Sequence, residues 1–381
     1  MLQINWGDLT PEKFLNEYWQ KKPLLIKNAF TDFIDPISAD ELAGLAMEQE
    51  IESRIISHHE KEKWQVAHGP FEAFDSFGET GWTLLVQAVN NWSGETGELL
   101  SPFTFLPNWR IDDVMVSFST PTGGVGAHLD QYDVFIVQGE GKRRWQVGLP
   151  DNTLQALLPH PDLKQVSEFI PFIDEITEPG DLLYIPPNHP HNGIAIENSL
   201  NFSIGFQAPN NQELWSSYTD KLIDEDRGEQ RFSDKNRSLT HNPEVLTTSD
   251  INEVKDFMLN MLAKDKSFSQ FLGCHLTQCH HALELLIPVT PFEPAKISEY
   301  FDVAGNTLTP VSGIKALYNE EDNNVYINGE LFQLCSETQS LGQLLGKNAA
   351  LTAESLKSFI DCLKNAQLLT SVLNKGFWFI E

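Results

Sequence analysis

The sequence predicts an α+β protein with a β-rich central region flanked by helices. From about residue 113 to 206, short apolar runs alternate with Gly- and Pro-containing turns, as in "DVMVSFS", "YDVFIVQG", "DLLYIPP" and "LNFSIGFQ". Several short strands at this spacing indicate an antiparallel sandwich or barrel. Helical patterns precede this region and return after it.

The N-terminal segment begins with helix signals. Thr10 is a good N-cap residue, Pro11 suits the first helical position, and apolar residues follow at helical spacing. The run "PLLIKNAF" is expected to be a short buried strand. A second helix is expected from about Ser38, capped by Ser38 or Asp40, and a third around "WTLLVQAVNNW" at residues 82–92.

Beyond the β-rich region the pattern is helical to about residue 286, and three prolines between residues 288 and 294 mark a linker. The last segment combines short helices with short strands and ends in "GFWFIE", which is typical of a winged-helix module. We therefore expect a domain at 1–209 with N-terminal helices and a β-barrel, a helical region at 210–290, and a winged-helix-like domain at 291–381.

Charge limits the possible partners of the chain. Its 54 acidic and 26 basic residues give a formal net charge of −28. This charge repels nucleic-acid phosphates and anionic membranes, so we expect a basic protein partner, no direct nucleic-acid binding and no membrane association. Four cysteines in a chain whose start lacks the features of a secretory leader indicate a reducing, cytoplasmic location.

The stretch "GAHLDQYDVFIV" contains a candidate metal motif. On a strand, alternate residues share a face, so His128, Asp130 and Tyr132 are expected to project together beside Val134 and Ile136. A carboxylate buried alone in a barrel is costly, and a divalent metal would offset that cost. A histidine and a carboxylate in this spacing match two ligands of the 2-His-1-carboxylate triad that binds Fe(II).

The third ligand is expected from "PGDLLYIPPNHPHNG". Two histidines are available there, and we favour His191 over His189. His189 lies in a turn between prolines, whereas His191 begins the next extended piece. Gly193 is its neighbour on the same face and would leave room for a metal.

A cation is needed if an organic dicarboxylate chelates the iron. In "GKRRWQV", alternation places Arg143 on the apolar, inward face with Trp145 and Val147. A guanidinium binds a carboxylate with two charge-assisted hydrogen bonds. Ser117, on the same face of its strand as Met115, would add a hydroxyl group. A solvated cation at a strand edge is the alternative for Arg143.

Three stretches together resemble the JmjC-type, cupin-fold 2-oxoglutarate oxygenases: "FLNEYWQKKPLLIKNAF", "HLDQYDVFIVQGEGKRRW" and "PGDLLYIPPNHPHNG". They are most similar to the bacterial ribosomal oxygenases, which hydroxylate an arginine of large ribosomal subunit protein 16. The resemblance implies a double-stranded β-helix (jelly roll), a helical dimerisation region and a homodimer. It also implies Fe(II) at His128, Asp130 and His191, 2-oxoglutarate at Ser117 and Arg143, and O2 as second cosubstrate.

The predicted function is hydroxylation of an arginine side chain, at C3, in that ribosomal protein. Tyr132, Asp112 and Met115 are the expected substrate contacts, because a carboxylate and an aromatic face hold a cation well. Three alternatives are a histidyl hydroxylase on the same scaffold, a metabolite cupin dioxygenase and a non-catalytic cupin-like scaffold. Arg143 argues against the metabolite enzyme, and the complete triad argues against the scaffold.

Two further histidine-containing stretches are weaker candidates. The cluster "GCHLTQCHH" is predicted to lie on an amphipathic helix from Phe268 to Leu286 rather than to bind zinc, because Cys274 and Cys279 fall on different faces. Another stretch precedes the barrel, and its histidines either line a substrate entrance or lie in exposed loops: His58, His59 and His68.

Overall fold

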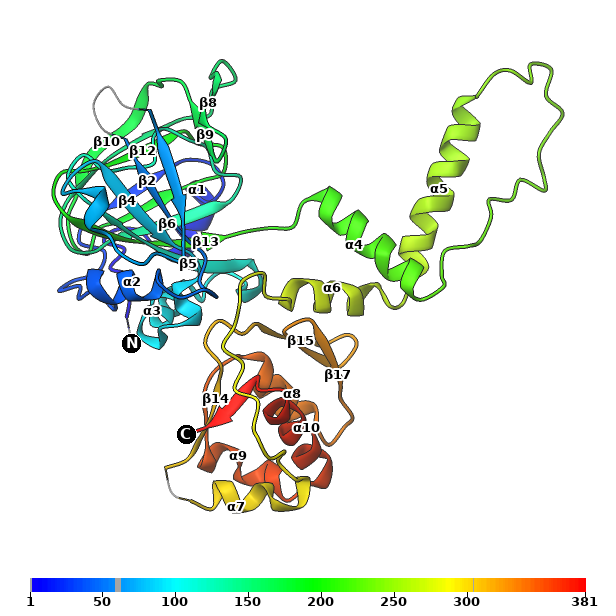
Figure 1. The fold of residues 1–381 in the computed structure, drawn as a ribbon. Coiled ribbons are helices and arrows are strands. Elements are labelled where there is room, and N and C mark those ends of the chain that lie inside the picture. Colours follow the sequence, from blue (N-terminus) through cyan, green and yellow to red (C-terminus); the bar gives the residue numbers. More distant parts are fainter. Residues whose placement is uncertain (1, 59–62, 304) are drawn as a thin grey trace. The chain divides into compact units, whose positions relative to one another are not determined.

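A computed structural model of the chain describes residues 2–58, 63–303 and 305–381 (Figure 1). The chain divides into two compact units. The first comprises Met1–Ala208, Cys279–Lys315 and Asn348–Glu381, and the second comprises Pro209–Gln278 and Ala316–Lys347.

The first unit contains a jelly roll built from two antiparallel sheets. The larger has eight strands in the order β1-β11-β6-β13-β5-β4-β2-β3, the smaller has the order β10-β7-β12, and β8 pairs with β9 as a hairpin. The strand bounds are β1 Leu24–Ile26, β2 Ser53–Ser57, β3 Gln65–His68, β4 Trp82–Val86, β5 Ile111–Ser119, β6 Asp133–Gln138, β7 Arg143–Gly148, β8 Ala156–His160, β9 Leu163–Val166, β10 Pro171–Thr177, β11 Leu182–Ile185, β12 His191–Ala195 and β13 Ser199–Phe206.

The N-terminal helices begin where their capping residues predict. Helix α1 (Pro11–Glu17) is capped by the Thr10 side chain, and α2 (Ala39–Leu45) by Ser38 in a complete capping box. Helix α3 spans Gly94–Gly97. Phe14 of α1 is fully buried and packs with its ring edge on Tyr184 of β11, which attaches the helix to the larger sheet.

The predicted helix at 82–92 is wrong. Residues Trp82–Val86 form β4, in the interior of the larger sheet between β2 and β5, and the chain then turns. All five residues of β4 are buried. A strand covered on both faces is a continuous apolar run, which has the same pattern as a short buried helix.

The metal motif also differs locally from the predicted strand. Strand β6 begins only at Asp133, and residues 126–132 precede it as an extended loop. Within this loop His128 forms isolated bridges with His191 and Gln165. The side chains still point as alternation requires, because all five predicted inward residues line one cavity: His128, Asp130, Tyr132, Val134 and Ile136.

The C-terminal part has the predicted mixture of helices and strands, in a winged-helix arrangement. In the first unit the elements are α7 Ile297–Phe301, β14 Thr307–Pro310, β18 Leu351–Thr352, α9 Ala353–Ile360, α10 Leu363–Asn374 and β19 Trp378–Ile380. Strand β14 lies between β18 and β19. The second unit contributes the meander β15 Ala316–Asn319, β16 Asn324–Ile327 and β17 Glu330–Gln333, with α8 Gln339–Gly346.

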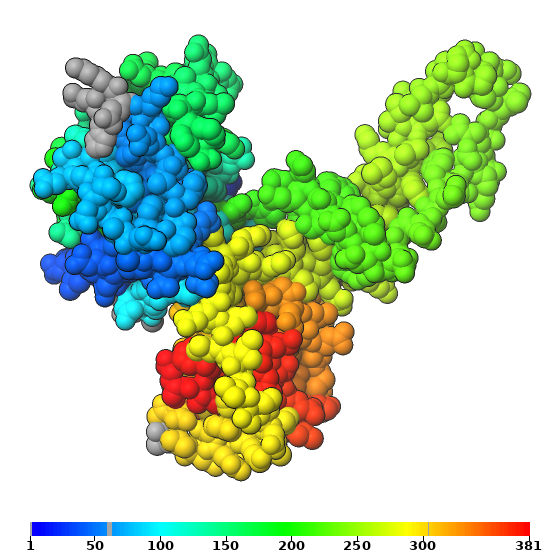
Figure 2. All heavy atoms as spheres, in the orientation of Figure 1, coloured from blue at the N-terminus to red at the C-terminus, as the bar shows by residue number. Residues whose placement is uncertain are grey.

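The remaining helices belong to the second unit and are α4 Asn211–Asp224, α5 Thr248–Lys264 and α6 Phe268–Thr277. The helix predicted to continue to residue 286 therefore ends at Thr277. Figure 2 shows an opening between α5 and the chain that leads into it. None of the described helices is both long and apolar enough to cross a membrane.

Asp133 anchors the start of β6. Its carboxylate is completely buried and accepts hydrogen bonds from the Tyr184 hydroxyl (2.6 Å), Gln20 Nε2 (2.9 Å) and an Arg110 guanidinium nitrogen (3.1 Å). Burial nevertheless raises its pKa above the usual range, so these bonds offset the desolvation cost only in part. Asp133 therefore faces the protein interior and not the solvent.

We predict that Asp133→Ala lowers the free energy of unfolding by about 3 kcal/mol or more, because it leaves buried donors unpaired. Urea denaturation measures this change. Asp174→Ala is the matched control, since its ion pair with Arg144 is solvent-exposed and contributes little to stability. Equal losses in the two variants would contradict the role of Asp133.

Candidate metal and cosubstrate site

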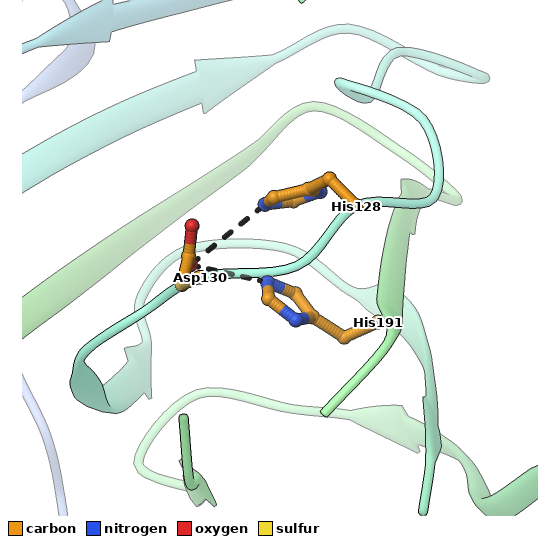
Figure 3. A group of neighbouring side chains, drawn as sticks. All are labelled: His128, Asp130 and His191. Atoms are coloured by element: carbon orange, nitrogen blue, oxygen red, sulfur yellow. Dashed lines mark ion pairs between the residues drawn. The ribbon is translucent and has the colours of Figure 1, made fainter. Parts of the chain in front are cut away.

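His128, Asp130 and His191 are brought together at one end of the barrel (Figure 3). His191 Nε2 lies 3.5 Å and His128 Nε2 3.9 Å from the same Asp130 oxygen, and the potential ligand atoms all lie within 4.8 Å of one another. In Figure 3 the three side chains point toward a common centre. Among the described residues, no other group of His, Cys, Asp and Glu meets this spacing.

Main-chain hydrogen bonds hold the two ligand segments in register. The His128 amide donates to the His191 carbonyl, and the His191 amide donates to the His128 carbonyl, both at 3.0 Å. The Asn188 amide donates to the Asp130 carbonyl at 2.7 Å. The ligands therefore lie on paired backbone although residues 128–130 are not part of a named strand.

Each imidazole is oriented by its second nitrogen. His128 Nδ1 lies 2.9 Å from the Gly126 carbonyl and His191 Nδ1 lies 3.0 Å from the His189 carbonyl. A carbonyl can only accept, so Nδ1 carries the proton in each ring. The Nε2 lone pairs are then directed at the Asp130 carboxylate, the arrangement that histidine ligands of metals adopt.

The ionisation states of this group suit a metal. Burial is the largest cause that lowers the pKa of His128 to about 4, so the ring is neutral near pH 7. Burial would raise the pKa of Asp130, but the neighbouring His191, His128 and Arg54 side chains outweigh burial and bring the pKa to about 2. Two imidazoles that present Nε2 and one carboxylate form the donor set that Fe(II) takes in facial-triad sites.

His189, the alternative ligand, does not join this group. It is buried, its Nδ1 lies 3.0 Å from the Pro187 carbonyl, and its Nε2 has no hydrogen-bond partner. Gly193 lines the same cavity as the triad. A Cβ atom there would lie 2.7 Å from the Trp145 ring, so glycine makes room for the indole.

Arg143 lies in the same cavity, which has a volume of about 590 Å³. Its guanidinium is buried and donates to three serine hydroxyls, at Ser119 (2.7 Å), Ser199 (3.2 Å) and Ser117 (3.3 Å). Its Nε has no hydrogen-bond partner, and burial lowers the pKa of Arg143 to about 9. No described carboxylate pairs with it within 4.0 Å.

Arg143 is a buried cation whose described neighbours are neutral, the three serine hydroxyls and the Trp145 ring, and an anion would offset its desolvation. The carboxylate of a dicarboxylate that chelates a metal at the triad would supply this anion, and the guanidinium fork would grip it. The next residue, Arg144, points outward and pairs with Asp174, as alternation requires.

Two of the three expected substrate residues line the cavity, and the third does not. Tyr132 and Met115 line the cavity, whereas Asp112 does not and lies 4.0 Å from Lys315 Nζ. On β5 it is Asp113 that alternates with Met115. Asp113 is buried, accepts a hydrogen bond from the Ala88 amide at 2.8 Å, and lies 3.8 Å from His281.

Several lining residues were missed by the sequence analysis. Arg54 and Ile56 come from β2, Leu85 from β4, and Leu163 and Gln165 from the β8–β9 hairpin. The alternation in "SRIIS" was a usable signal for β2, but β4 was assigned to a helix. His68 lies at the cavity and pairs with Asp162 at 3.1 Å, His58 stacks on Trp64, and His59 lies outside the described residues.

Comparisons with known proteins agree with this geometry. The JmjC domain family matches residues 98–214, and the ROXA-like winged helix family matches residues 260–379. The chain is 44% identical over 380 residues to the ribosomal protein uL16 3-hydroxylase of Escherichia coli K12, covering 100% of this chain and 99% of that one. A Haemophilus influenzae protein described as a probable ribosomal oxygenase is 32% identical over 339 residues, covering 84% and 82% of the two chains.

Solved structures give the same result. The chain is similar to the structure of YcfD, a ribosomal oxygenase from E. coli, in complex with cobalt and 2-oxoglutarate, with a TM-score of 0.90 and 42% identity. That match covers 100% of both chains.

We predict that Asp130→Ala abolishes high-affinity Co(II) binding, because it removes the one carboxylate of the group and leaves two neutral imidazoles. Calorimetric titration of the metal-free protein with Co(II) measures this loss, and circular dichroism checks the fold. His189→Gln is the matched control and should bind Co(II) as the unchanged protein does. Retained binding by Asp130→Ala would exclude this residue as a ligand.

Proposed function

Because the chain belongs to the ribosomal oxygenase family of JmjC-domain 2-oxoglutarate oxygenases, we propose that it hydroxylates C3 of an arginine side chain in ribosomal protein uL16. The observation that carries this proposal is the 44% identity to a uL16 3-hydroxylase over essentially the whole of both chains. The buried, unpaired Arg143 beside the metal-binding group supports it.

In this proposal His128, Asp130 and His191 hold Fe(II), and Ser117 and Arg143 hold the far carboxylate of 2-oxoglutarate. Iron, 2-oxoglutarate and O2 supply the oxidising power that puts one oxygen atom into a substrate C–H bond. The protein fixes the imidazoles through their Nδ1 hydrogen bonds, as described above. Val134, Ile136 and Trp145 give the cavity apolar walls that exclude water.

For the substrate we propose Tyr132 and Met115 as contacts within the cavity. Burial, followed by the charge of Asp130, raises the pKa of Tyr132 far above neutrality, so its hydroxyl stays protonated and can donate a hydrogen bond. Asp112 stays in the proposal as a more distant carboxylate that attracts the cationic side chain. Met115 contributes an adaptable apolar surface for the methylene groups of arginine.

Hydroxylation of a histidine on the same scaffold is the remaining alternative, because the metal group determines the reaction and not the target residue. A metabolite dioxygenase and a non-catalytic scaffold are set aside by membership of the ribosomal oxygenase family.

We predict that the purified protein, supplied with Fe(II), 2-oxoglutarate and O2, adds one oxygen atom to unmodified uL16. Intact-mass measurement detects a shift of about 16 Da, and fragmentation assigns it to C3 of one arginine. His128→Ala, which removes a ligand from the metal group, is the negative control. A modified histidine would support the alternative, and an unmodified uL16 would refute both.

We further propose that the protein works in the cytoplasm as a homodimer, with residues 210–290 as the dimerisation region and boundaries after residues 209 and 290. Helix α5 supports the homodimer. None of its 17 residues is buried, and it exposes five large apolar side chains: Ile251, Val254, Met258, Leu259 and Met261. Such a surface is typical of a protein interface. The acidic chain would attract basic uL16 rather than bind nucleic acid directly.

We predict that Leu259→Glu converts a dimer into a monomer, because it places a charge in the apolar surface of α5. Light scattering coupled to size-exclusion chromatography gives the molar mass. Asn260→Glu puts the same charge on the neighbouring exposed position and should leave the dimer intact. If the wild-type protein is already a monomer, the proposed homodimer is refuted.

A further inference from the structure

Arg54 is a second guanidinium in the cavity. On β2, Arg54 and Ile56 line the cavity, whereas Ile55 between them belongs to the hydrophobic core on the other side of the sheet. Arg54 pairs in register with Leu85 of β4, and Leu85 pairs with Ser117 of β5. Two strand spacings therefore separate Arg54 from Ser117, about 10 Å along the sheet.

The guanidinium of Arg54 has no acidic partner among the described residues. Its Nε is buried without a hydrogen-bond partner, and no described carboxylate lies within 4.0 Å. Several other arginines of this acidic chain have acidic partners: Arg110 with Asp133, Arg144 with Asp174 and Arg227 with Asp265. The chain has 54 acidic and only 26 basic residues, so an arginine without an acidic partner is unusual in it.

The acidic groups that line the cavity have other partners. Asp130 lies against His128 and His191 in the metal-binding group. Asp162 lies 3.1 Å from His68 Nε2 and 3.7 Å from His160 Nδ1. Arg54 is thus left to interact with a bound molecule.

The chemistry of that molecule follows from the guanidinium. It repels the cationic head of a substrate arginine, so it does not hold the side chain that is hydroxylated. Its planar array of N–H donors suits carbonyl and carboxylate oxygens, which a polypeptide presents along its main chain and on acidic side chains. Arg143 already serves the cosubstrate end of the cavity, where the serine hydroxyls surround it.

We propose that Arg54 binds an oxygen acceptor of the substrate polypeptide, a main-chain carbonyl or a carboxylate beside the hydroxylated residue. The contact fixes the polypeptide while its target side chain reaches the metal. This inference rests on the proposed function, because it needs a polypeptide substrate. The charge of Arg54 also acts on Asp130, although no hydrogen bond joins the two side chains in the described structure, and the measurements below separate the two roles.

Position in the chain agrees with a role in substrate choice. Residues His128, Asp130, His191, Ser117 and Arg143 all fall within the 98–214 segment matched by the JmjC family. Arg54 lies outside that segment, on a strand that precedes it. A residue that served only the metal chemistry would be expected inside the segment.

The test compares Arg54→Met and Arg54→Lys with the unchanged full-length protein on unmodified uL16. Loss of charge-assisted hydrogen bonds predicts a KM for uL16 raised about 10- to 100-fold in Arg54→Met, with kcat nearly unchanged. Arg54→Lys should recover part of the loss, because it keeps the charge but not the fork. Arg144→Met, on the outward face of β7, is the matched control and should keep the original KM.

Two measurements separate substrate binding from support of the metal. Co(II) affinity and the slow turnover of 2-oxoglutarate without uL16 should be the same in Arg54→Met and the unchanged protein. An unaltered KM for uL16, or a parallel fall in Co(II) affinity, would overturn the inference while leaving the proposed function intact. Failure of the unchanged protein to modify uL16 would overturn both.

A second form of uL16, with the acidic residues beside the target replaced by their amides, distinguishes the two acceptors. If the effect of Arg54→Met disappears with this form, the acceptor is a side-chain carboxylate. If the effect persists, it is a main-chain carbonyl. Either result supports Arg54 as a contact for the polypeptide.

Discussion

The reciprocal main-chain pairing of His128 and His191 is the constraint on which the site depends. The two segments are far apart in the chain, and two hydrogen bonds of 3.0 Å fix them against each other. The pairing sets the separation of the imidazoles, whose ring centroids lie 4.1 Å apart, and it brings Asp130 to both. Each Nδ1 also donates a hydrogen bond to a carbonyl, which fixes the orientation of the ring. Each Nε2 therefore points toward the shared centre.

A second constraint is the cost of burying charge. Arg143 is buried among serine hydroxyls, and Arg54 has a buried Nε without a partner, although acidic residues are abundant elsewhere in the chain. A buried guanidinium without an acidic partner lowers the stability of the fold unless a bound ligand supplies that partner. Asp133 shows the contrast, because its three partners all come from the protein and its role is to anchor β6. The Asp133 network therefore holds the fold, whereas the guanidinium groups of Arg54 and Arg143 face the cavity without an acidic partner.

Much of this could be predicted from the sequence, because it depends on local rules. Alternation correctly placed Arg143 inward and Arg144 outward, and capping signals located the starts of α1 and α2. Strand β4 was predicted to be a helix. A strand that is buried on both faces is a continuous apolar run and lacks the alternation of polar and apolar residues that identifies a strand. Other features depend on tertiary contacts that local sequence patterns do not show. Asp112 lies outside the cavity lining, and the absence of a side chain at Gly193 accommodates Trp145.

The cavity wall is built from two parts of the chain, which explains why the metal motif alone does not determine the substrate. The groups proposed for iron and 2-oxoglutarate come from β5, β7, β12 and the loop before β6, all inside the segment matched by the JmjC domain family. Another part of the cavity wall comes from β2, β3 and β4, which precede that segment. Substitutions there would leave the proposed metal ligands in place, because His128 and His191 are fixed by their own main-chain pairing. If Arg54 contacts the polypeptide as proposed, the strands that carry Arg54 and Leu85 are where differences in substrate between relatives should be sought.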